Sequence, residues 1–144
     1  LKAPIQRNVN DAEVVAGKQI FTKAQCNSCH VSSLKTGYSP ISTLSNKEFA
    51  AYTDLLMHDM GKELDDNYTE GTAKTYEWRT TPLWGLGLGK NSQGGRLFLM
   101  HDGRAKTIEE AILLHGGEGD RSRQRYKALS ATEKQQLITF LESI

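Results

Sequence analysis

The residues best suited to chemistry lie in one short segment of the chain. Both cysteines of the 144-residue sequence occur in the pentapeptide Cys26-Asn27-Ser28-Cys29-His30. A Cys-x-x-Cys-His segment is typical of covalent haem c attachment. Two thiols at this spacing can add across the two vinyl groups of one porphyrin edge, and the adjacent histidine can then bind the iron as its proximal ligand. The segment therefore predicts one covalent haem c held by Cys26, Cys29 and His30.

Three other interpretations of the two cysteines are open but weaker. A redox-active dithiol belongs at the start of a helix in a strand–helix–strand unit, and strand-like runs are nearly absent from this sequence. A structural zinc site needs four ligands, usually as two spaced pairs, and the sequence has no further cysteine. The third is a histidine that follows two structural cysteines by coincidence. Haem c is favoured, and because bacteria attach it outside the cytoplasm, it predicts a periplasmic or secreted protein.

The chemistry of such a haem depends on the side chain that faces His30 across the ring. An apolar stripe at helical spacing contains Ile108, Ala111, Ile112 and His115. His115 therefore projects from a buried helix face and is the predicted distal ligand, with a hydrogen-bonded core histidine as the ordinary alternative. Met60 is the second candidate, because it lies beside a turn-forming glycine and a loop-borne methionine is a common distal ligand. The other possible ligands are Met57, His58, Met100 and His101.

Three capping signals outline the helices that must position these residues. The pairs are Asn10 with Glu13, Thr107 with Glu110, and Ser130 with Glu133. A capping residue followed three positions later by a glutamate marks a helix start. The predicted helices run from about 11 to 24, from 107 to about 115, and from 130 to 144, and the last carries an apolar stripe. A less regular pattern over 49–56 predicts one more helix.

The arrangement of these helices suggests a fold. Gly17 and Phe21 are four residues apart on the first helix and share a face, where a glycine allows another helix to approach closely. This helix, the haem segment after it and the apolar terminal helix together resemble the class I cytochrome c fold. The resemblance implies a mostly α-helical domain with long loops wrapped around a covalent haem, its first and last helices crossing near Gly17. The polar segment 61–76 and the glycine-rich segment 85–95 predict the loops.

Composition excludes several classes of function. The 18 Lys and Arg residues nearly balance 17 Asp and Glu residues, and the net charge of +1 gives no global field for nucleic acid or an anionic membrane. The longest apolar run, 111–114, is far shorter than the ~20 residues of a membrane-spanning helix. The length predicts one domain over 1–144. The start at Leu1, without an apolar signal core, predicts a processed mature chain or an excised domain.

Three longer blocks carry a more specific resemblance. They are YTDLLMHDMG at 52–61, WRTTPLWGLG at 78–87 and HDGRAKTIEEAILLHGG at 101–117. From about Lys2 to Ile144 the chain resembles the C-terminal haem domain of bacterial di-haem oxidoreductases, which are often labelled thiol oxidoreductases. These proteins are relatives of the di-haem cytochrome c peroxidases. In the peroxidase relatives the third block leads into a helix whose end supplies the distal ligand, and His115 falls at that position.

The resemblance also implies roles for residues around the ring. Arg79 would reach a haem propionate, because a guanidinium binds a carboxylate in a bidentate manner. A surface ion pair with a nearby acid is the alternative for this arginine. Pro82, Leu83 and Trp84 would line the ring, a role that nearly coincides with ordinary core packing.

One departure from the family limits what the resemblance implies. The peroxidase relatives use two haems, one to relay electrons and one to react, whereas this sequence has a single Cys-x-x-Cys-His segment. The sequence therefore predicts one-electron transfer through a six-coordinate haem between His30 and His115, without catalysis. The alternative function is that of a haem peroxidase or oxidase with an open distal site.

The partners follow from this function. A redox protein would exchange electrons with a monomeric haem domain, and as a module of a larger secreted protein the domain would serve an oxidoreductase such as a copper monooxygenase. A local basic cluster is the predicted docking site for an acidic partner, with local ion pairing as the alternative. It comprises Arg121, Arg123, Arg125 and Lys127.

Overall fold

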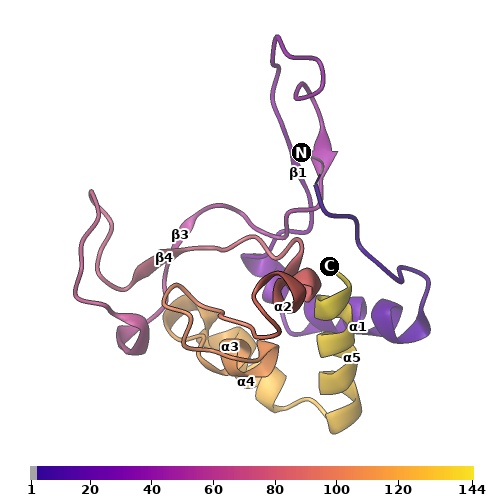
Figure 1. Cartoon of the computed structure of the whole chain (residues 1–144). Helices are drawn as coiled ribbons and strands as arrows, with labels where there is room; N and C mark the ends of the chain where they lie inside the picture. The colour runs from indigo at the N-terminus through magenta and orange to yellow at the C-terminus, as the bar shows by residue number, and fades with distance from the viewer. Residues whose placement is uncertain (1–2) are drawn as a thin grey trace.

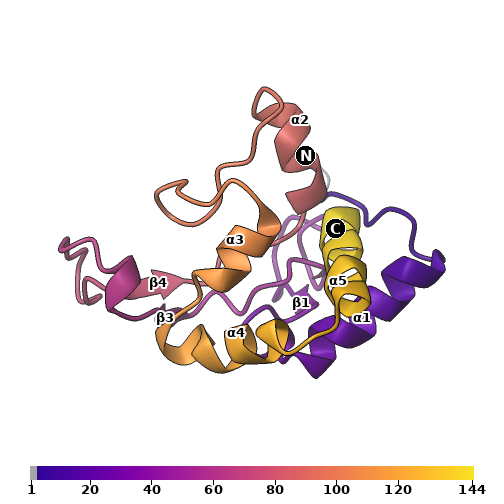
Figure 2. The ribbon, with the colours of Figure 1, turned by 90° about the horizontal axis from the view of Figure 1, so that it is seen from below.

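The structure is a computed structural model that describes residues 3–144, and Figures 1 and 2 show its ribbon in two views. Its helices are α1 (Ala12–Lys23), α2 (Gly89–Ser92), α3 (Ile108–Leu113), α4 (Asp120–Lys127) and α5 (Ala131–Ser143), with short 3-10 helices η1 (Cys26–Ser28), η2 (Lys62–Leu64), η3 (Leu86–Leu88) and η4 (Gly117–Gly119). Its strands are β1 (Leu34–Lys35), β2 (Glu48–Phe49), β3 (Met57–Asp59) and β4 (Glu77–Arg79).

The prediction of a mostly α-helical, class I cytochrome c-like domain is wrong. Helix accounts for only 39% of the structure and strand for 8%, as small helices and two short sheets. No helix forms over 49–56, because Tyr52 (φ 55°) and Leu55 (φ 61°) have left-handed backbone angles that an α-helix does not contain. The fold is therefore a mixed one, in which long irregular segments connect small elements.

The predicted contact between the first and last helices is confirmed. Helices α1 and α5 cross in both views (Figures 1 and 2), and a Cβ atom at Gly17 would lie 2.0 Å from the Gln136 carbonyl oxygen. The core gathers beside this crossing, where the Phe21 ring lies 5.4 Å from the Phe140 ring and 6.1 Å from the Tyr52 ring. The absence of a side chain at Gly17 thus sets the distance between the two helices.

The three predicted helix starts are confirmed to within one residue. Asp11, rather than Asn10, caps α1 with its carboxylate, and Thr107 caps α3 through its hydroxyl. Ser130 forms a complete capping box at the start of α5. Helix α3 ends at Leu113, two residues before the predicted distal ligand. Each start is fixed because a side-chain oxygen accepts a backbone N–H group that has no partner inside the helix.

Both sheets are antiparallel pairs that extend away from the helices (Figure 1). Strand β1 pairs with β2, and strand β3 pairs with β4. In the second pair Met57 lies opposite Arg79, His58 opposite Trp78 and Asp59 opposite Glu77. The register brings the first two family blocks side by side, although they are separated by the polar segment 61–76.

The helices are short, and the sequence does not predict two of them, α2 and α4. Helix α2 lies within the glycine-rich segment 85–95, for which the sequence predicts a loop. Helix α4 carries the basic cluster and has almost no apolar face, so hydrophobic periodicity did not indicate it. The longest helix, α5, has 13 residues. Within residues 3–144, no helix combines the length and the apolar character that crossing a lipid bilayer requires.

The close approach of α1 and α5 at Gly17 allows a test that distinguishes a packing effect from a helix-propensity effect. The two effects predict opposite changes in the free energy of unfolding. Propensity alone would make Gly17→Ala stabilising by about 1 kcal/mol. Because the new methyl group meets the α5 backbone, we expect instead a loss of about 1–3 kcal/mol in the free energy of unfolding, measured by urea denaturation. Gly37→Ala is the control, since a Cβ atom there meets nothing within 4 Å, and a gain in stability for Gly17→Ala would contradict the packing argument.

Candidate functional site

The Cys-x-x-Cys-His segment forms a tight turn directly after α1. Gln25 has a left-handed backbone (φ 61°) and turns the chain into η1, and the His30 backbone N–H donates to the Cys26 carbonyl over 3.1 Å. Both cysteines are free thiols. Cys26 packs against the hydrophobic core beside the α1–α5 crossing. The turn thus brings the two thiols and the His30 imidazole to one end of α1.

The two thiols are not activated for redox chemistry. Burial raises the pKa of Cys26 to about 11. Burial and the negative charges of Asp54 and Glu118 raise the pKa of Cys29. A dithiol that exchanges disulfides needs a lowered thiol pKa, because the thiolate is the nucleophile. These environments therefore argue against the redox-dithiol interpretation.

His30 is held in one orientation by the backbone. Its Nδ1–H group donates to the Tyr52 carbonyl over 3.0 Å, which leaves Nε2 without a proton. Burial lowers the pKa of His30 to about 4, despite the opposing effect of this carbonyl. The imidazole is therefore neutral and presents a lone pair at Nε2, as a metal ligand requires.

His115 has the same arrangement just beyond the end of α3. Its Nδ1–H group donates to the Ala111 carbonyl over 2.7 Å, and burial lowers its pKa. Its ring lies close to that of His30, with ring centres 6.4 Å apart and planes inclined at 54°. Among residues 3–144, neither Nε2 atom has a hydrogen-bond partner. Two neutral imidazoles from distant parts of the chain therefore lie close together, and their Nε2 atoms have no hydrogen-bond partner among the described residues.

The separation of the two rings fits a shared metal ion. An imidazole nitrogen binds a first-row metal ion at about 2.0–2.1 Å and lies about 1.1 Å from its ring centre, so two imidazoles on opposite sides of one ion have centres about 6.2–6.4 Å apart. The observed 6.4 Å agrees with this value. Together with the two free thiols of the adjacent turn, the histidine pair provides the donor set that a covalently attached haem needs.

Met60 lies apart from the two imidazoles, against the glycines that follow His115. Its backbone N–H donates to the Tyr76 carbonyl over 3.0 Å, and its carbonyl oxygen would lie 2.6 Å from a Cβ atom at Gly116. It lines a cavity of about 150 Å³ whose lining includes neither His30 nor His115. The segment around Met60 thus forms a seam against the glycines that follow His115.

This seam fixes the loop that carries His115. A Cβ atom at Gly117 would lie 2.1 Å from the Asp59 carbonyl oxygen, and Gly117 has a left-handed backbone (φ 48°). Glu118, the next residue, accepts the Asp59 backbone N–H over 3.0 Å. Two backbones can approach this closely only where side chains are absent. The pair of glycines after His115 therefore lets the loop dock on β3.

The residues expected around the ring lie along and after β4. Arg79 is exposed opposite Met57 and has no ion pair within the described part of the chain. Leu83 packs against the core, and Pro82 beside it is half-buried. Trp84 remains 37% exposed, with its ring centre 5.6 Å from that of Phe49. Their contacts with a haem stay predictions.

Two of the remaining candidate ligands, His58 and His101, contact other partners. Both ring nitrogens of His58 lie against carboxylates, those of Asp54 and Glu118. The His101 ring stacks on the Trp78 indole, with ring centres 3.5 Å apart and planes within 10°. Sequence reasoning missed Asp54, Glu118 and the Tyr52 carbonyl, because no local pattern marks residues that meet only in the folded chain.

The basic cluster is less concentrated than its sequence suggests. In helix α4 Arg123 pairs with Asp120, and Arg125 donates to the side chain of Gln25. Residues two apart on a helix project to different sides. The cluster does not form one basic face, and its role in docking stays a prediction.

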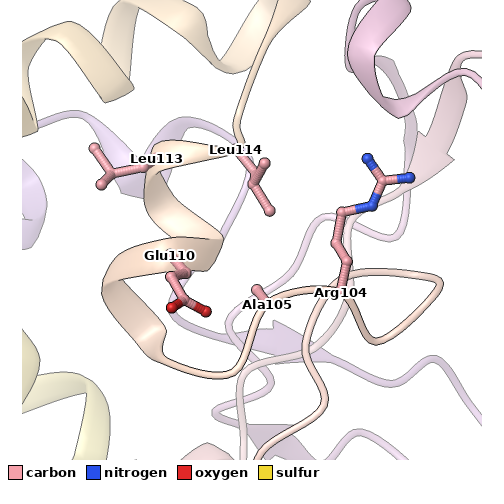
Figure 3. A pocket seen from close by; sticks show the side chains of 5 residues that line it. All are labelled: Arg104, Ala105, Glu110, Leu113 and Leu114. Carbon is pink, nitrogen blue, oxygen red and sulfur yellow. The ribbon is translucent and has the colours of Figure 1, made fainter.

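A second cavity lies beside the segment that leads to His115 (Figure 3). It has a volume of about 350 Å³ and is lined by Arg104, Ala105, Glu110, Leu113 and Leu114. Leu113 and Leu114, which line this cavity, directly precede His115 in the sequence. Their spacing puts these two leucines and Glu110 on the side of the turn away from the Ile108, Ala111 and His115 stripe. The cavity therefore lies behind the distal candidate and not between the two imidazoles.

A comparison with known protein families indicates haem-based redox chemistry. A family model described as that of di-haem oxidoreductases, with peroxidase as the proposed activity, matches residues 1–144. No curated protein matches the chain. Among solved structures, hydrazine synthase of Kuenenia stuttgartiensis is similar in fold, with a TM-score of 0.52, 18% identity, and coverage of 99% of this chain and 50% of that one. The chain thus spans about half the length of the hydrazine synthase chain.

Because the loop after His115 docks on β3, we expect a methyl group at Gly117 to lower the free energy of unfolding by more than a strained backbone alone would. Gly117→Ala and Gly71→Ala both place alanine at a left-handed backbone, which costs about 1–2 kcal/mol. Only Gly117→Ala also brings the methyl group against a backbone carbonyl, so we expect a further loss of about 1–3 kcal/mol in the free energy of unfolding. Urea denaturation of both variants measures the difference, and equal losses would show that the loop does not dock as described.

Proposed function

Since the chain belongs to the di-haem oxidoreductase family, we propose that it carries one covalent haem c and transfers single electrons. The family indicates haem-based redox chemistry, and the sequence contains one attachment segment. The observation that carries the proposal is the close pair of neutral imidazoles, His30 and His115, with ring centres 6.4 Å apart. Cys26 and Cys29 would hold the porphyrin edge, while His30 and His115 would bind the iron.

The chain's own residues determine what such a site can do. A bound haem supplies an iron that changes between the ferric and ferrous states by one electron. The Tyr52 and Ala111 carbonyls fix the two imidazoles in the tautomer that ligates through Nε2. Because His30 and His115 would both bind the iron, no coordination site would be left for peroxide or oxygen. A second histidine in place of methionine favours a lower reduction potential.

The surrounding residues support a haem-holding role. Arg79 has no competing ion pair within residues 3–144, so its guanidinium is available to a propionate carboxylate. Leu83 and Trp84 offer apolar surface on the same segment, next to Pro82. We propose that these side chains line the porphyrin and that Met60, which lies on the loop seam, does not bind the iron.

The setting and partners follow from covalent haem attachment. The proposed location is the periplasm or the outside of a bacterial cell, where haem c is attached and thiol pairs would otherwise oxidise. The proposed partner is a redox protein that meets an exposed haem edge in a transient complex. Residues 1–144 would act as one electron-transfer domain, alone or as a module of a larger secreted redox protein that serves an oxidoreductase such as a copper monooxygenase.

Optical and redox measurements on the purified holoprotein test the proposal. The alkaline pyridine spectrum reports thioether-linked haem and its amount per chain, and we expect one haem. A potentiometric titration should follow a single one-electron curve. A high-spin ferric spectrum, which indicates an open site, would overturn the proposal in favour of peroxide chemistry.

The ligand assignment predicts the effect of removing each histidine. His115→Ala should change the ferric spectrum from low spin to high spin, because it opens the distal position. His101→Ala is the matched control and should leave the spectrum unchanged, since this histidine stacks on Trp78. A sulfur-to-iron band in the far red of the wild-type spectrum would contradict His115 as the ligand and favour Met60.

A further inference from the structure

An ionic cluster outside the ligand pair joins three segments of the chain. The His58 side chain, only 15% exposed, lies with Nε2 at 2.8 Å from Asp54 Oδ2 and Nδ1 at 2.9 Å from Glu118 Oε2. Its Nδ1 atom also lies 3.9 Å from Cys29 Sγ. A histidine with a carboxylate at each nitrogen is a fixed ionic link rather than a free surface group.

The two contacts define the protonation state of the ring. Ionised carboxylates only accept hydrogen bonds, and a neutral imidazole has one N–H group to donate. Two carboxylate partners therefore require protons on both nitrogens. In agreement, the hydrogen bond to Glu118 raises the pKa of His58, against the effect of burial, and in turn lowers the pKa of Glu118.

The doubly protonated state of His58 shows whether this cluster is a metal site or a salt bridge. Cys29, Asp54 and His58 each offer a ligand atom, and these atoms lie within 4.8 Å of one another. An imidazolium has no lone pair to give to a metal ion, and Cys29 belongs to the haem attachment segment. The cluster is therefore best described as a cation held between two anions.

The cluster connects the segments that carry both proposed iron ligands. Asp54 follows, by two residues, the Tyr52 carbonyl that holds His30. Glu118 follows His115 by three residues and also accepts the Asp59 backbone N–H over 3.0 Å. His58 itself lies in β3, between these two partners. One side chain thus fastens the loop after His115 to the segment that orients His30.

We propose that His58 is a positioning residue that keeps His115 on the iron by fastening the loop 115–119 to the segment 52–54 through Asp54 and Glu118. This inference rests on the proposed bis-histidine haem. His58 does not touch the iron. It acts by resisting the loop movement that must accompany dissociation of His115, and the glycine seam at Asp59 and Gly117 supports it from the same side.

Cyanide binding to the ferric holoprotein tests this role, because cyanide can bind only when His115 leaves the iron. We expect His58→Leu and Glu118→Gln each to increase the rate of cyanide binding at least tenfold, measured by stopped-flow absorbance. The double variant should be no faster than the faster single variant, since both changes break the same link. His101→Leu is the control and should keep the wild-type rate.

A second readout does not depend on the iron. Amide hydrogen exchange of residues 115–119 should be faster in His58→Leu and Glu118→Gln than in the wild type or the control. Glu118→Gln keeps the size of a half-exposed side chain, so it tests the link even if His58→Leu fails to fold. A wild-type cyanide rate and wild-type exchange in Glu118→Gln would overturn the inference, as would equal acceleration in His101→Leu.

The outcomes separate this inference from the function on which it rests. A wild-type protein that is already high spin, or that has methionine on its iron, would overturn the proposed bis-histidine site and this role of His58 with it. A low-spin wild type whose His58 and Glu118 variants bind cyanide at the wild-type rate would overturn the positioning role alone.

Discussion

The separation between two neutral imidazoles is the constraint on which the rest of the structure depends. His30 and His115 come from opposite halves of the chain, yet their ring centres lie 6.4 Å apart and each ring is oriented by a backbone carbonyl. The α1–α5 crossing fixes the end of α1, from which the first imidazole follows, and the loop seam fixes the second. A small shift of either ring would change this separation. The proposed iron site therefore needs close packing around both histidines.

Backbone strain contributes to this geometry. Tyr52 and Leu55 have left-handed backbone angles, which cost about 1–3 kcal/mol each for residues of this size. The turn at Tyr52 brings its carbonyl to His30 while its side chain stays in the core. Such strain persists only where the surrounding residues hold the backbone in one conformation. Here the core holds it on one side and the His58 cluster on the other.

Local signals in the sequence predicted the local parts of this structure. The Cys-x-x-Cys-His segment and the three helix caps depend on residues a few positions apart and have clear sequence patterns. The approach of Gly17 to Gln136 joins the two ends of the chain, and it was implied by the resemblance to class I cytochromes c. The mostly helical fold class failed because apolar spacing over 49–56 does not reveal left-handed residues. The contacts of His58 with Asp54 and Glu118 could not be predicted either, since they join segments whose relative positions only the folded chain sets.

The environment of the two thiols would affect how the chain behaves before the proposed haem is attached. Burial raises the pKa of Cys26 to about 11, so this thiol is protonated at neutral pH. Disulfide formation needs a thiolate, so a raised pKa slows the oxidation to which an exposed thiol pair is prone in an oxidising compartment. The burial that packs Cys26 against the core would therefore also slow its oxidation, and in the proposed haem protein it would leave this sulfur atom available for thioether formation.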